Sequence, residues 1–391
     1  MGFVERLNEM GSLPYGGVSK IPGLYLHVPF CQSKCGYCDF YSVTDLALMD
    51  EWVEAILAEM ETYRDRFEAF DTIYFGGGTP SLLPAKQLER ILSHAEKTFH
   101  LFSHAEITLE ANPGDLDRSH LSMLKRVGVN RIVLGIQSFD EAILTFLGRR
   151  HRAKEGHFAI LHAREAGFEN VGLDLIYGVP GQDEASWRRT LEQALAFSPE
   201  HISCYELTLG AETPLGKRRK AGAFELPEET LQYDFFMKTV QCLEEAGYVQ
   251  YEVSNFAKEP PSFSRHNQKY WDHTPYLGLG PSAHSFLSGK RWWNHRSLSR
   301  YLTDVKKGKA PVEGSEILTI EELRLEALFL GLRTRRGVDL ERFRREYGYD
   351  LVGERGELLA RLENEGLISI RDGLLVPTRA GMAVGDSLAL M

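Results

Sequence analysis

The stretch CQSKCGYCDF, residues 31–40, decides how the chain is interpreted, because it places three cysteines within eight positions. A structural zinc site is closed by four ligands, and a cubane iron–sulfur cluster has four irons to coordinate. Asp39 could complete a zinc site, but such mixed sites are uncommon beside three cysteines. The C-x3-C-x2-C spacing therefore favours a [4Fe–4S] cluster held by Cys31, Cys35 and Cys38, with one iron left open to an external ligand.

The composition sets limits on the class of protein. The chain has 391 residues, of which 43% are hydrophobic and 26% charged, which allows a large domain and a smaller one and excludes extensive disorder. The net charge of −10 argues against general nucleic-acid binding. There is no apolar run of the roughly 18 residues that a membrane span needs, no signal-peptide layout and no secreted disulfide framework. We therefore expect a cytoplasmic protein in a reducing compartment.

From residue 23 onward, short β-rich runs alternate with amphipathic helical patterns. Strands separated by helices favour parallel pairing with right-handed crossovers. The expected fold is α/β, a partial (β/α)6 barrel of the TIM type that is short of a full eight-stranded one. We expect strands near 23–28, 71–78, 105–113, 129–138, 171–180 and 201–209, and helices near 46–63, 85–99, 119–127, 153–166, 184–197 and 228–246.

The pattern changes after the barrel. The segment 251–310 is rich in proline, glycine, aromatic residues and histidine, has no clear period, and is expected to be a long irregular connector. Helices near 321–332, 339–346 and 354–365, followed by a hairpin at Asp372-Gly373, predict a small winged-helix-like domain. Its mixed charges favour a packing or lid module over DNA binding. The expected division is an N-terminal extension (1–22), the barrel (23–250), the connector (251–310) and the C-terminal domain (311–391).

The residues with evident chemistry fall at the carboxyl ends of the predicted strands. Ligands bind at this edge of a parallel barrel, and polar strand ends explain one or two such residues more easily than a full set. The glycine run in FGGGTP lets bare backbone approach a ligand, and it lacks the Gly-Lys-Ser/Thr of a nucleotide-binding loop. The set consists of Cys31, Gly76–Gly78, Glu110, Gln137 and Asp174.

With its cysteine loop and glycine run, the sequence resembles the radical S-adenosylmethionine superfamily, in which the open iron chelates that cofactor. The motifs YLHVPFCQSKCGYCDF, FGGGTPSLL, LEANPG, GIQSF, LGRRH, LDLIYGVPGQ and NQKYWDHTPYLGLGPSAHSF are together similar to the oxygen-independent coproporphyrinogen III oxidase-like family, from about residue 23 to the C-terminus. The resemblance implies S-adenosylmethionine contacts at Tyr25, Tyr37, Gly77, Gly78, Thr79, Glu110, Gln137, Arg149 and Asp174. Carboxylates suit the ribose and ammonium groups of this cofactor, and Arg149 suits its carboxylate.

Two features separate the branches of this family. Phe40 occupies the position at which the true dehydrogenase has a further cysteine, and HNQKYW, from His266 to Trp271, matches the H-N-x-x-Y-W stretch of a heme chaperone branch. Histidine is a common heme ligand, and Tyr270 and Trp271 offer flat surface for a macrocycle. From the residues alone, we expect His266 to be hydrogen-bonded within the fold and Tyr270 and Trp271 to be buried packing residues. The resemblance instead implies a heme site. The nearby His273, His284 and His295 leave the identity of the ligand open.

The expected function is that of a heme chaperone which binds the cluster, S-adenosylmethionine and heme, and transfers heme to acceptor hemoproteins. The resemblance also implies an electron donor such as flavodoxin or ferredoxin. The alternative is a radical enzyme, either coproporphyrinogen III dehydrogenase or a related methyltransferase. A nucleic-acid regulator that uses the C-terminal module is a third hypothesis, against which the acidic charge balance argues. No catalytic residue is assigned, and whether the protein is an enzyme stays open.

Overall fold

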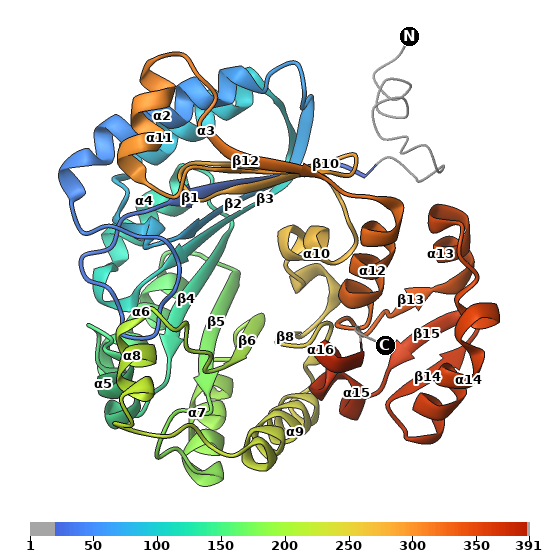
Figure 1. The fold of residues 1–391 in the computed structure, drawn as a ribbon. Helices are drawn as coiled ribbons and strands as arrows, with labels where there is room; N and C mark the ends of the chain where they lie inside the picture. The colour runs from blue at the N-terminus through green and yellow to red at the C-terminus, as the bar shows by residue number, and fades with distance from the viewer. Residues whose placement is uncertain (1–19, 389–391) are drawn as a thin grey trace.

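The computed structural model describes residues 20–388, so that most of the predicted N-terminal extension lies outside the described residues. Six parallel strands form the centre of the fold and lie side by side in chain order (Figure 1). Their parallel register confirms the predicted α/β fold with a parallel sheet. These strands are β1 (Gly23–Val28), β2 (Ala69–Gly77), β3 (His100–Ala111), β4 (Arg131–Gln137), β5 (Asn170–Tyr177) and β6 (His201–Glu206).

Amphipathic helices cover the outer face of these strands (Figure 1). In α3, for example, Leu88, Ile91 and Leu92 form the buried stripe that the spacing predicts. The two short helices α5 and α8 were not predicted, because seven residues hold too little periodic pattern to be recognised. The helices are α2 (Met49–Thr62), α3 (Ala85–Thr98), α4 (Arg118–Arg126), α5 (Glu141–Leu147), α6 (Ala153–Glu165), α7 (Glu184–Ala196), α8 (Pro214–Lys220) and α9 (Glu229–Glu245).

The sheet continues beyond the six strands at both edges and has twelve strands within the described residues. Strand β8 (Asn255–Ala257) pairs antiparallel with β6 and carries β7 (Val249–Gln250) outside it. At the other edge, β9 (Tyr276–Leu279) pairs parallel with β1 and is followed by β10 (His284–Leu287), β11 (Lys290–Asn294) and β12 (Val312–Ile317).

The segment 251–310 is therefore ordered and part of the sheet, which differs from the expected irregular connector. Its strands have three to five residues each, too short for alternation to be visible in the sequence. It also contains two helices, α10 (Arg265–Trp271) and α11 (Leu298–Lys306). Because β8 and β9 lie at opposite edges of the parallel strands, α10 between them crosses the open side of the barrel (Figure 1).

A buried acid holds the added strands to the barrel. Glu59 of α2 accepts hydrogen bonds from the Gly280 amide at 2.9 Å, from Asn294 Nδ2 at 2.6 Å and from the Tyr301 hydroxyl at 2.6 Å. Burial raises the pKa of Glu59 to about 7, although these three donors lower it. One side chain thereby links α2 to the β9–β10 turn, to β11 and to α11.

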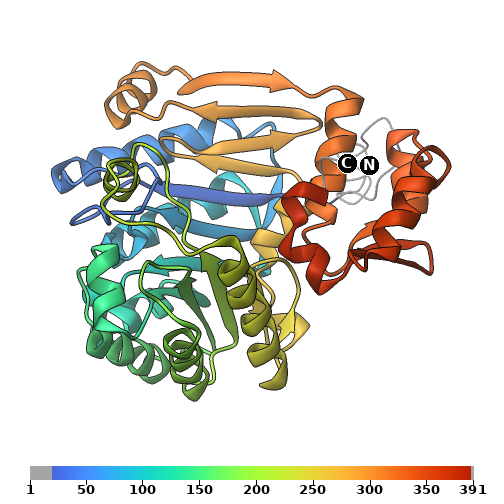
Figure 2. The same cartoon turned by 60° about the horizontal axis from the view of Figure 1, so that its bottom comes forward.

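The C-terminal module lies beside the barrel and has its own apolar core, which includes Leu332, Phe343, Leu359 and Ile368 (Figure 2). Three helices precede the β14–β15 hairpin, as predicted. The domain boundaries themselves stay a prediction. No helix within residues 20–388 is long and apolar enough to cross a membrane. The module consists of α12 (Ile320–Gly331), β13 (Val338–Asp339), α13 (Leu340–Tyr347), α14 (Leu351–Asn364), β14 (Ile368–Arg371), β15 (Leu374–Pro377), α15 (Arg379–Ala383) and α16 (Gly385–Leu388).

Candidate functional site

A cavity of about 480 Å³ lies at the carboxyl ends of the parallel strands. All three clustered cysteines, Cys31, Cys35 and Cys38, contribute to its lining. The structure thus brings together predicted site residues that are up to 143 positions apart in the sequence, from Cys31 to Asp174. Of the residues predicted to contact S-adenosylmethionine, those that line the cavity are Tyr37, Gly77, Gly78, Thr79, Glu110, Gln137, Arg149 and Asp174.

The cysteine loop is held in place by backbone hydrogen bonds to three other segments. The amide of Cys31 donates to the Val43 carbonyl at 2.9 Å, and Gly36 donates to Leu147 and accepts from Leu215. The loop follows β1 directly, so the strand fixes where the first thiol lies. All three cysteines are half-buried and free of disulfides.

Two polar side chains point hydrogen-bond donors at the thiols. Thr79 Oγ1 donates to Cys31 Sγ and Arg149 Nη1 donates to Cys35 Sγ, both at 3.4 Å. Both sulfurs therefore face a hydrogen-bond donor beside the cavity. No group of three or more His, Cys, Asp or Glu side chains in residues 20–388 is arranged to hold a metal ion. Three thiols on one short loop are the ligand type of an iron–sulfur cluster, whereas a structural zinc ion would need a fourth ligand.

The glycine run forms one wall of the cavity from bare backbone. Gly77 has a φ of +107°, and a Cβ atom there would lie 2.7 Å from the His27 ring. A Cβ atom at Gly78 would lie 2.7 Å from the Phe30 carbonyl oxygen and 2.9 Å from that of Val28. A side chain at Gly77 would have to displace the His27 ring in a left-handed backbone conformation, and one at Gly78 would have to move the backbone of β1 and its loop.

Two half-buried acids, Glu110 and Asp174, line the cavity. Glu110 accepts a hydrogen bond of 2.7 Å from the Tyr74 hydroxyl. Burial raises the pKa of Glu110 to about 7 and that of Asp174 to about 6. Each acid is therefore suited to a ligand that brings positive charge or hydrogen-bond donors, since such a ligand offsets the cost of burying the ionised form.

Arg149 and Gln137 line the same cavity and offer complementary groups. Arg149 Nη2 donates to Asn112 Oδ1 and to the Gly135 carbonyl, both at 2.7 Å. Burial lowers the pKa of Arg149, but Tyr37 and Cys35 raise it, and the net shift is upward. Gln137 has a φ of +64°, and its Oε1 is buried with no hydrogen-bond partner within the described chain. A strained residue with an unused acceptor beside a cavity is suited to bind a ligand donor.

Tyr25 does not line the cavity. Its hydroxyl lies 3.1 Å from His27 Nδ1, and its ring stacks on Tyr74 with centroids 6.2 Å apart. A Cβ atom at Gly76 would lie 3.0 Å from both tyrosine rings, so Tyr25 lies directly beneath the glycine run. Its predicted contact with the cofactor stays a prediction, and the structure gives it a supporting position.

The residues predicted to bind heme lie apart from this cavity, in and around α10. His266 is only 1% exposed, its Nδ1 lies 2.8 Å from Thr72 Oγ1, and its Nε2 lies 2.8 Å from the Tyr270 hydroxyl. Burial lowers the pKa of His266 to about 3. Both ring nitrogens are thus occupied, and His266 opens onto none of the cavities described in this section.

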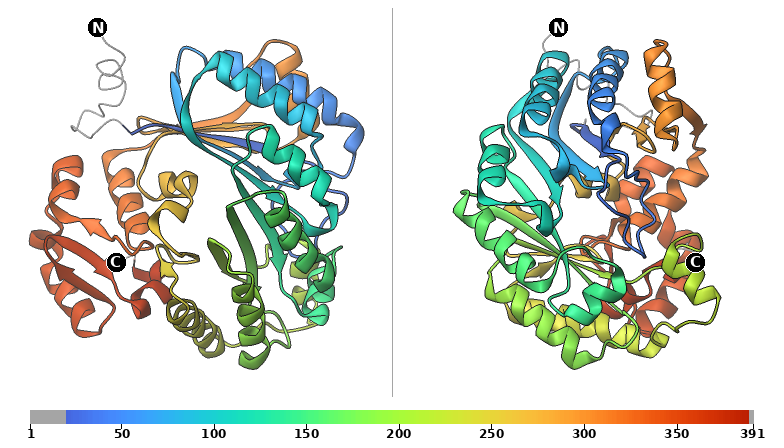
Figure 3. Two further views of the ribbon diagram at one scale, coloured as in Figure 1. Left: turned by 180° about the vertical axis from the view of Figure 1, so that it is seen from behind. Right: turned by 90° about the vertical axis from the view of Figure 1, so that its left-hand side faces the viewer.

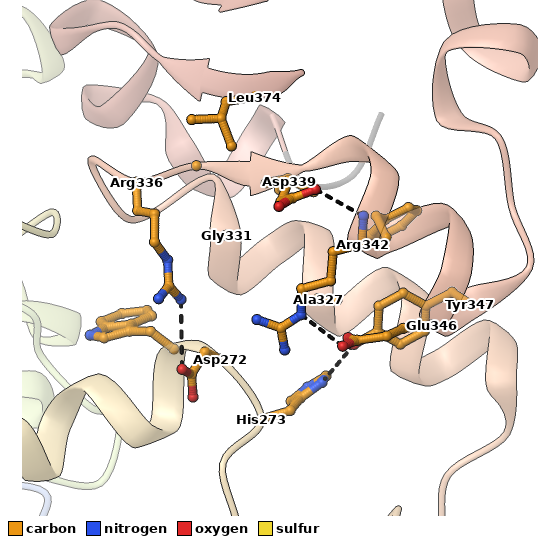
Figure 4. Close-up of a pocket in the computed structure, with 14 residues that line it drawn as sticks. Asp272, His273, Ala327, Gly331, Arg336, Asp339, Arg342, Glu346, Tyr347 and Leu374 are labelled. Carbon is orange, nitrogen blue, oxygen red and sulfur yellow. Dashed lines mark hydrogen bonds and ion pairs between the residues drawn. The ribbon is translucent and has the colours of Figure 1, made fainter. Parts of the chain in front are cut away.

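Trp271, at the end of α10, lines a pocket shared with the C-terminal module, and Figure 4 shows the paired arginines of this pocket. The pocket has a volume of about 180 Å³, and its arginines are paired, Arg336 with Asp272 at 3.6 Å and Arg342 with Glu346 at 2.7 Å. Of the other three histidines considered, His273 contacts the Tyr347 hydroxyl at 3.3 Å, His295 contacts Asp304 at 3.0 Å, and His284 stacks on Trp293.

Three residues of the site were not predicted: Asn112 and Tyr205, which line the cavity, and Tyr74, which contacts a lining residue. Asn112 holds Arg149, Tyr74 holds Glu110, and Tyr205 lines the cavity at the end of β6. Asn112 and Tyr205 follow the same rule as the predicted residues, since both lie at the carboxyl end of a parallel strand. Tyr74 lies inside β2, and no feature of the sequence distinguishes it from a core residue.

Comparison with known proteins agrees with this geometry. The radical SAM superfamily model matches residues 25–194, and the HemN C-terminal domain model matches residues 318–384. The heme chaperone HemW of Lactococcus lactis is 35% identical over 369 residues, which cover 93% of this chain and 95% of that protein. HemW of Bacillus subtilis is 34% identical over 369 residues, with 93% and 97% covered.

A solved structure confirms the fold. The coproporphyrinogen III oxidase HemN of Escherichia coli aligns with a TM-score of 0.83 and 22% identity, over 100% of this chain and 93% of that one. A parallel barrel with three cysteines at its mouth defines a radical SAM protein. Within that class, the chain belongs to the HemN-like family and is close to the HemW proteins.

Proposed function

We propose that the protein is a heme chaperone that binds a [4Fe–4S] cluster, S-adenosylmethionine and heme, and transfers heme to acceptor hemoproteins. The observation that carries this proposal is the nearly full-length similarity to proteins named heme chaperone HemW. Phe40, where the dehydrogenase branch is expected to have a fourth cysteine, supports the same choice. The proposed location is the cytoplasm, a compartment that keeps the thiols reduced.

In this proposal Cys31, Cys35 and Cys38 hold the cluster, which when bound supplies one electron for reductive cleavage of the cofactor's sulfonium. Thr79 and Arg149 stabilise the thiolates through the hydrogen bonds described above. The backbone of Gly77 and Gly78 lets the cofactor approach closely. Glu110 and Asp174 offer acceptors for its ammonium or ribose hydroxyl groups, and Arg149 offers donors to its carboxylate.

We expect the affinity for S-adenosylmethionine to fall as the pH is lowered from about 8 to about 6. The raised pKa of Glu110, about 7, means that this acid is protonated at the lower pH and must lose its proton to pair with a cationic ligand. The loss is at most about tenfold per pH unit. Isothermal titration across this range measures it. Glu110→Gln should remove most of the dependence, whereas the exposed Glu54→Gln should keep it; an unchanged slope in Glu110→Gln would contradict the assignment.

Heme is proposed to bind at the HNQKYW segment, with His266 as the iron ligand. A nitrogen that binds iron needs a free lone pair. His266 Nε2 is engaged with the Tyr270 hydroxyl, so this conformation is closed to heme. Binding therefore requires α10 to release His266. Arg336 and Arg342, beside Trp271, are paired with Asp272 and Glu346. They can bind heme propionates only if these ion pairs break.

Tyr270→Phe tests this assignment, because it removes the competing hydrogen bond and keeps the flat ring. We expect heme to bind roughly fivefold more tightly, since a net hydrogen bond is worth about 1 kcal/mol. His266→Ala should abolish binding while sparing the cluster. Tyr248→Phe, which removes a buried hydrogen bond to Pro199, is the matched control. The Soret band on heme titration measures all four proteins, and full binding by His266→Ala would exclude this ligand.

The rival proposal is an enzyme that acts on a porphyrin. Anaerobic reconstitution of the cluster, followed by titration with heme and with coproporphyrinogen III, separates the two. A chaperone binds heme and passes it to an apo-hemoprotein such as apomyoglobin, without forming protoporphyrinogen. Turnover of coproporphyrinogen III with release of 5′-deoxyadenosine would overturn the chaperone proposal.

A further inference from the structure

Two adjacent arginines, Arg149 and Arg150, reach the cysteine loop at different points. Arg149 Nη1 faces Cys35 Sγ, as described above, whereas Arg150 Nη1 donates a hydrogen bond of 2.5 Å to Gln32 Oε1. Both arginines also line the cavity. One arginine therefore contacts the second cysteine of the loop, and the other contacts the residue that directly follows the first cysteine.

A buried carboxylate, Asp115, joins the two arginines through hydrogen bonds. It lies in the turn η3 (Pro113–Asp115) that follows β3, and its side chain is only 4% exposed. Its two oxygens accept from Arg150 Nη2 at 2.7 and 2.6 Å, and one of them also accepts from Asn112 Nδ2 at 3.0 Å. Asn112 Oδ1 in turn accepts from Arg149 Nη2 at 2.7 Å. The side chains thus form one hydrogen-bonded chain that begins and ends on the cysteine loop: Gln32, Arg150, Asp115, Asn112, Arg149 and Cys35.

The spacer between the first two cysteines, residues 32–34, has few other contacts. These three residues are exposed and belong to no helix or strand, and the loop runs along the side of the molecule that faces the viewer in the right-hand view of Figure 3. In the described part of the chain, the hydrogen bond from Arg150 is the only one that reaches residues 32–34. Cys31 and Gly36, which flank this region, are instead held by backbone hydrogen bonds. A movement of the spacer would change the distance between the first two thiols.

A contribution to stability alone does not account for this arrangement. The Arg150 side chain is 29% exposed, and ion pairs that are partly exposed add little to stability. Arg164, which is also 29% exposed, pairs with Glu200 at 2.7 Å at the end of the strands opposite to the cavity. The other hydrogen bonds of Arg164 go to backbone carbonyls. The pair of Arg150 and Asp115 differs because the remaining donor of the guanidinium is directed at the cysteine loop.

We propose that Arg150 and Asp115 are positioning residues that hold the spacer through Gln32 and thereby fix the separation of the Cys31 and Cys35 thiols. Asp115 holds one edge of the planar guanidinium, so that the other edge is presented to Gln32. Groups that orient metal ligands in this way typically change metal affinity by about 10–100-fold when they are removed. This inference rests on the proposed function for the presence of the cluster.

The test is the rate at which the ferrous chelator bathophenanthroline disulfonate removes iron from the reconstituted protein under anaerobic conditions. Gln32→Ala removes the contact with the loop and leaves the ion pair between Arg150 and Asp115 in place. Arg150→Ala removes both. Thermal melting of each full chain before reconstitution measures stability separately, so that an effect on the loop can be distinguished from a general loss of stability.

Two matched controls lie away from the cavity. Gln87→Ala removes a glutamine whose Oε1 accepts a hydrogen bond of 2.8 Å from Arg90 on α3, as Gln32 accepts one from Arg150. Arg164→Ala removes an arginine of the same exposure from its ion pair with Glu200. Iron and sulfide content after reconstitution check that every sample starts from the same cluster.

We expect Gln32→Ala to lose iron at least about fivefold faster than the wild type with an unchanged thermal midpoint, and Arg150→Ala at least about tenfold faster. Both controls should stay within about twofold of the wild type, although Arg164→Ala melts at a lower temperature. Unchanged iron loss in Gln32→Ala, or an equal acceleration in Arg150→Ala and Arg164→Ala, would overturn the proposal. Wild-type protein that takes up no cluster would instead count against the proposed function, whereas a wild-type cluster that all variants retain equally well rejects the positioning role alone.

Discussion

Cys35→Ala should yield a folded chain that holds no stable cluster and no longer binds S-adenosylmethionine. A cubane with three protein ligands leaves one iron for the cofactor, and two remaining thiolates cannot keep that arrangement. Arg149 would also lose the sulfur that its Nη1 faces at 3.4 Å. Iron and sulfide per chain after anaerobic reconstitution, together with isothermal titration of the cofactor, measure the effect.

The matched control is Cys242→Ala on α9. Cys242 is half-buried, lies against the core and takes no part in the cavity. We expect this variant to keep the iron content and cofactor affinity of the wild type. Retention of four irons per chain in Cys35→Ala would disprove the proposed ligand set.

Gly78→Ala should weaken cofactor binding by more than tenfold and lower the thermal midpoint. The added methyl group would lie 2.7 Å from the Phe30 carbonyl oxygen and 2.9 Å from that of Val28, and both are backbone atoms that cannot rotate away. Relief requires β1 and β2 to separate at the cavity wall, where the Gly78 amide donates to Val28 at 2.8 Å. Overpacking of this kind typically costs about 1–3 kcal/mol.

Gly114→Ala is the control for this substitution. A Cβ atom at Gly114 would meet nothing closer than 3.5 Å, and the residue has no left-handed conformation. We expect it to match the wild type in thermal melting and in cofactor titration. If Gly78→Ala binds the cofactor as tightly as Gly114→Ala does, the glycine run does not serve as the proposed wall.

The sequence predicts most of the parallel barrel because its helices are long and its strands end in polar residues. The apolar stripe of α3 and the run that forms β5 are visible without the structure. The extension of the sheet at both edges is not visible, since β8 and β9 are only three and four residues long. Which edge each short strand joins depends on contacts between distant segments, and no local pattern records them.

The candidate site is predicted to a similar extent. Its lining residues follow one rule, because parallel strands bring their carboxyl ends to a common edge. The rule does not show that Tyr25 lies beneath the glycine run. Side chains alternate between the two faces of a strand, and the face that Tyr25 occupies is known only once its pairing with Tyr74 is known. Nor does it show that both nitrogens of His266 are occupied, because Thr72 is 194 positions away in the chain.

The course of α10 across the open side of the barrel has a consequence for the chemistry that one chain can combine. His266 meets β2 at Thr72, five residues before Gly77, and at about 3.3 Å per residue this is roughly 16 Å along the strand. Heme bound at His266 would lie at the base of the barrel, whereas a radical would form at its mouth. The rings of Tyr25 and Tyr74 would lie between the two. If heme and S-adenosylmethionine bind where we propose, the fold keeps the two ligands apart within one chain.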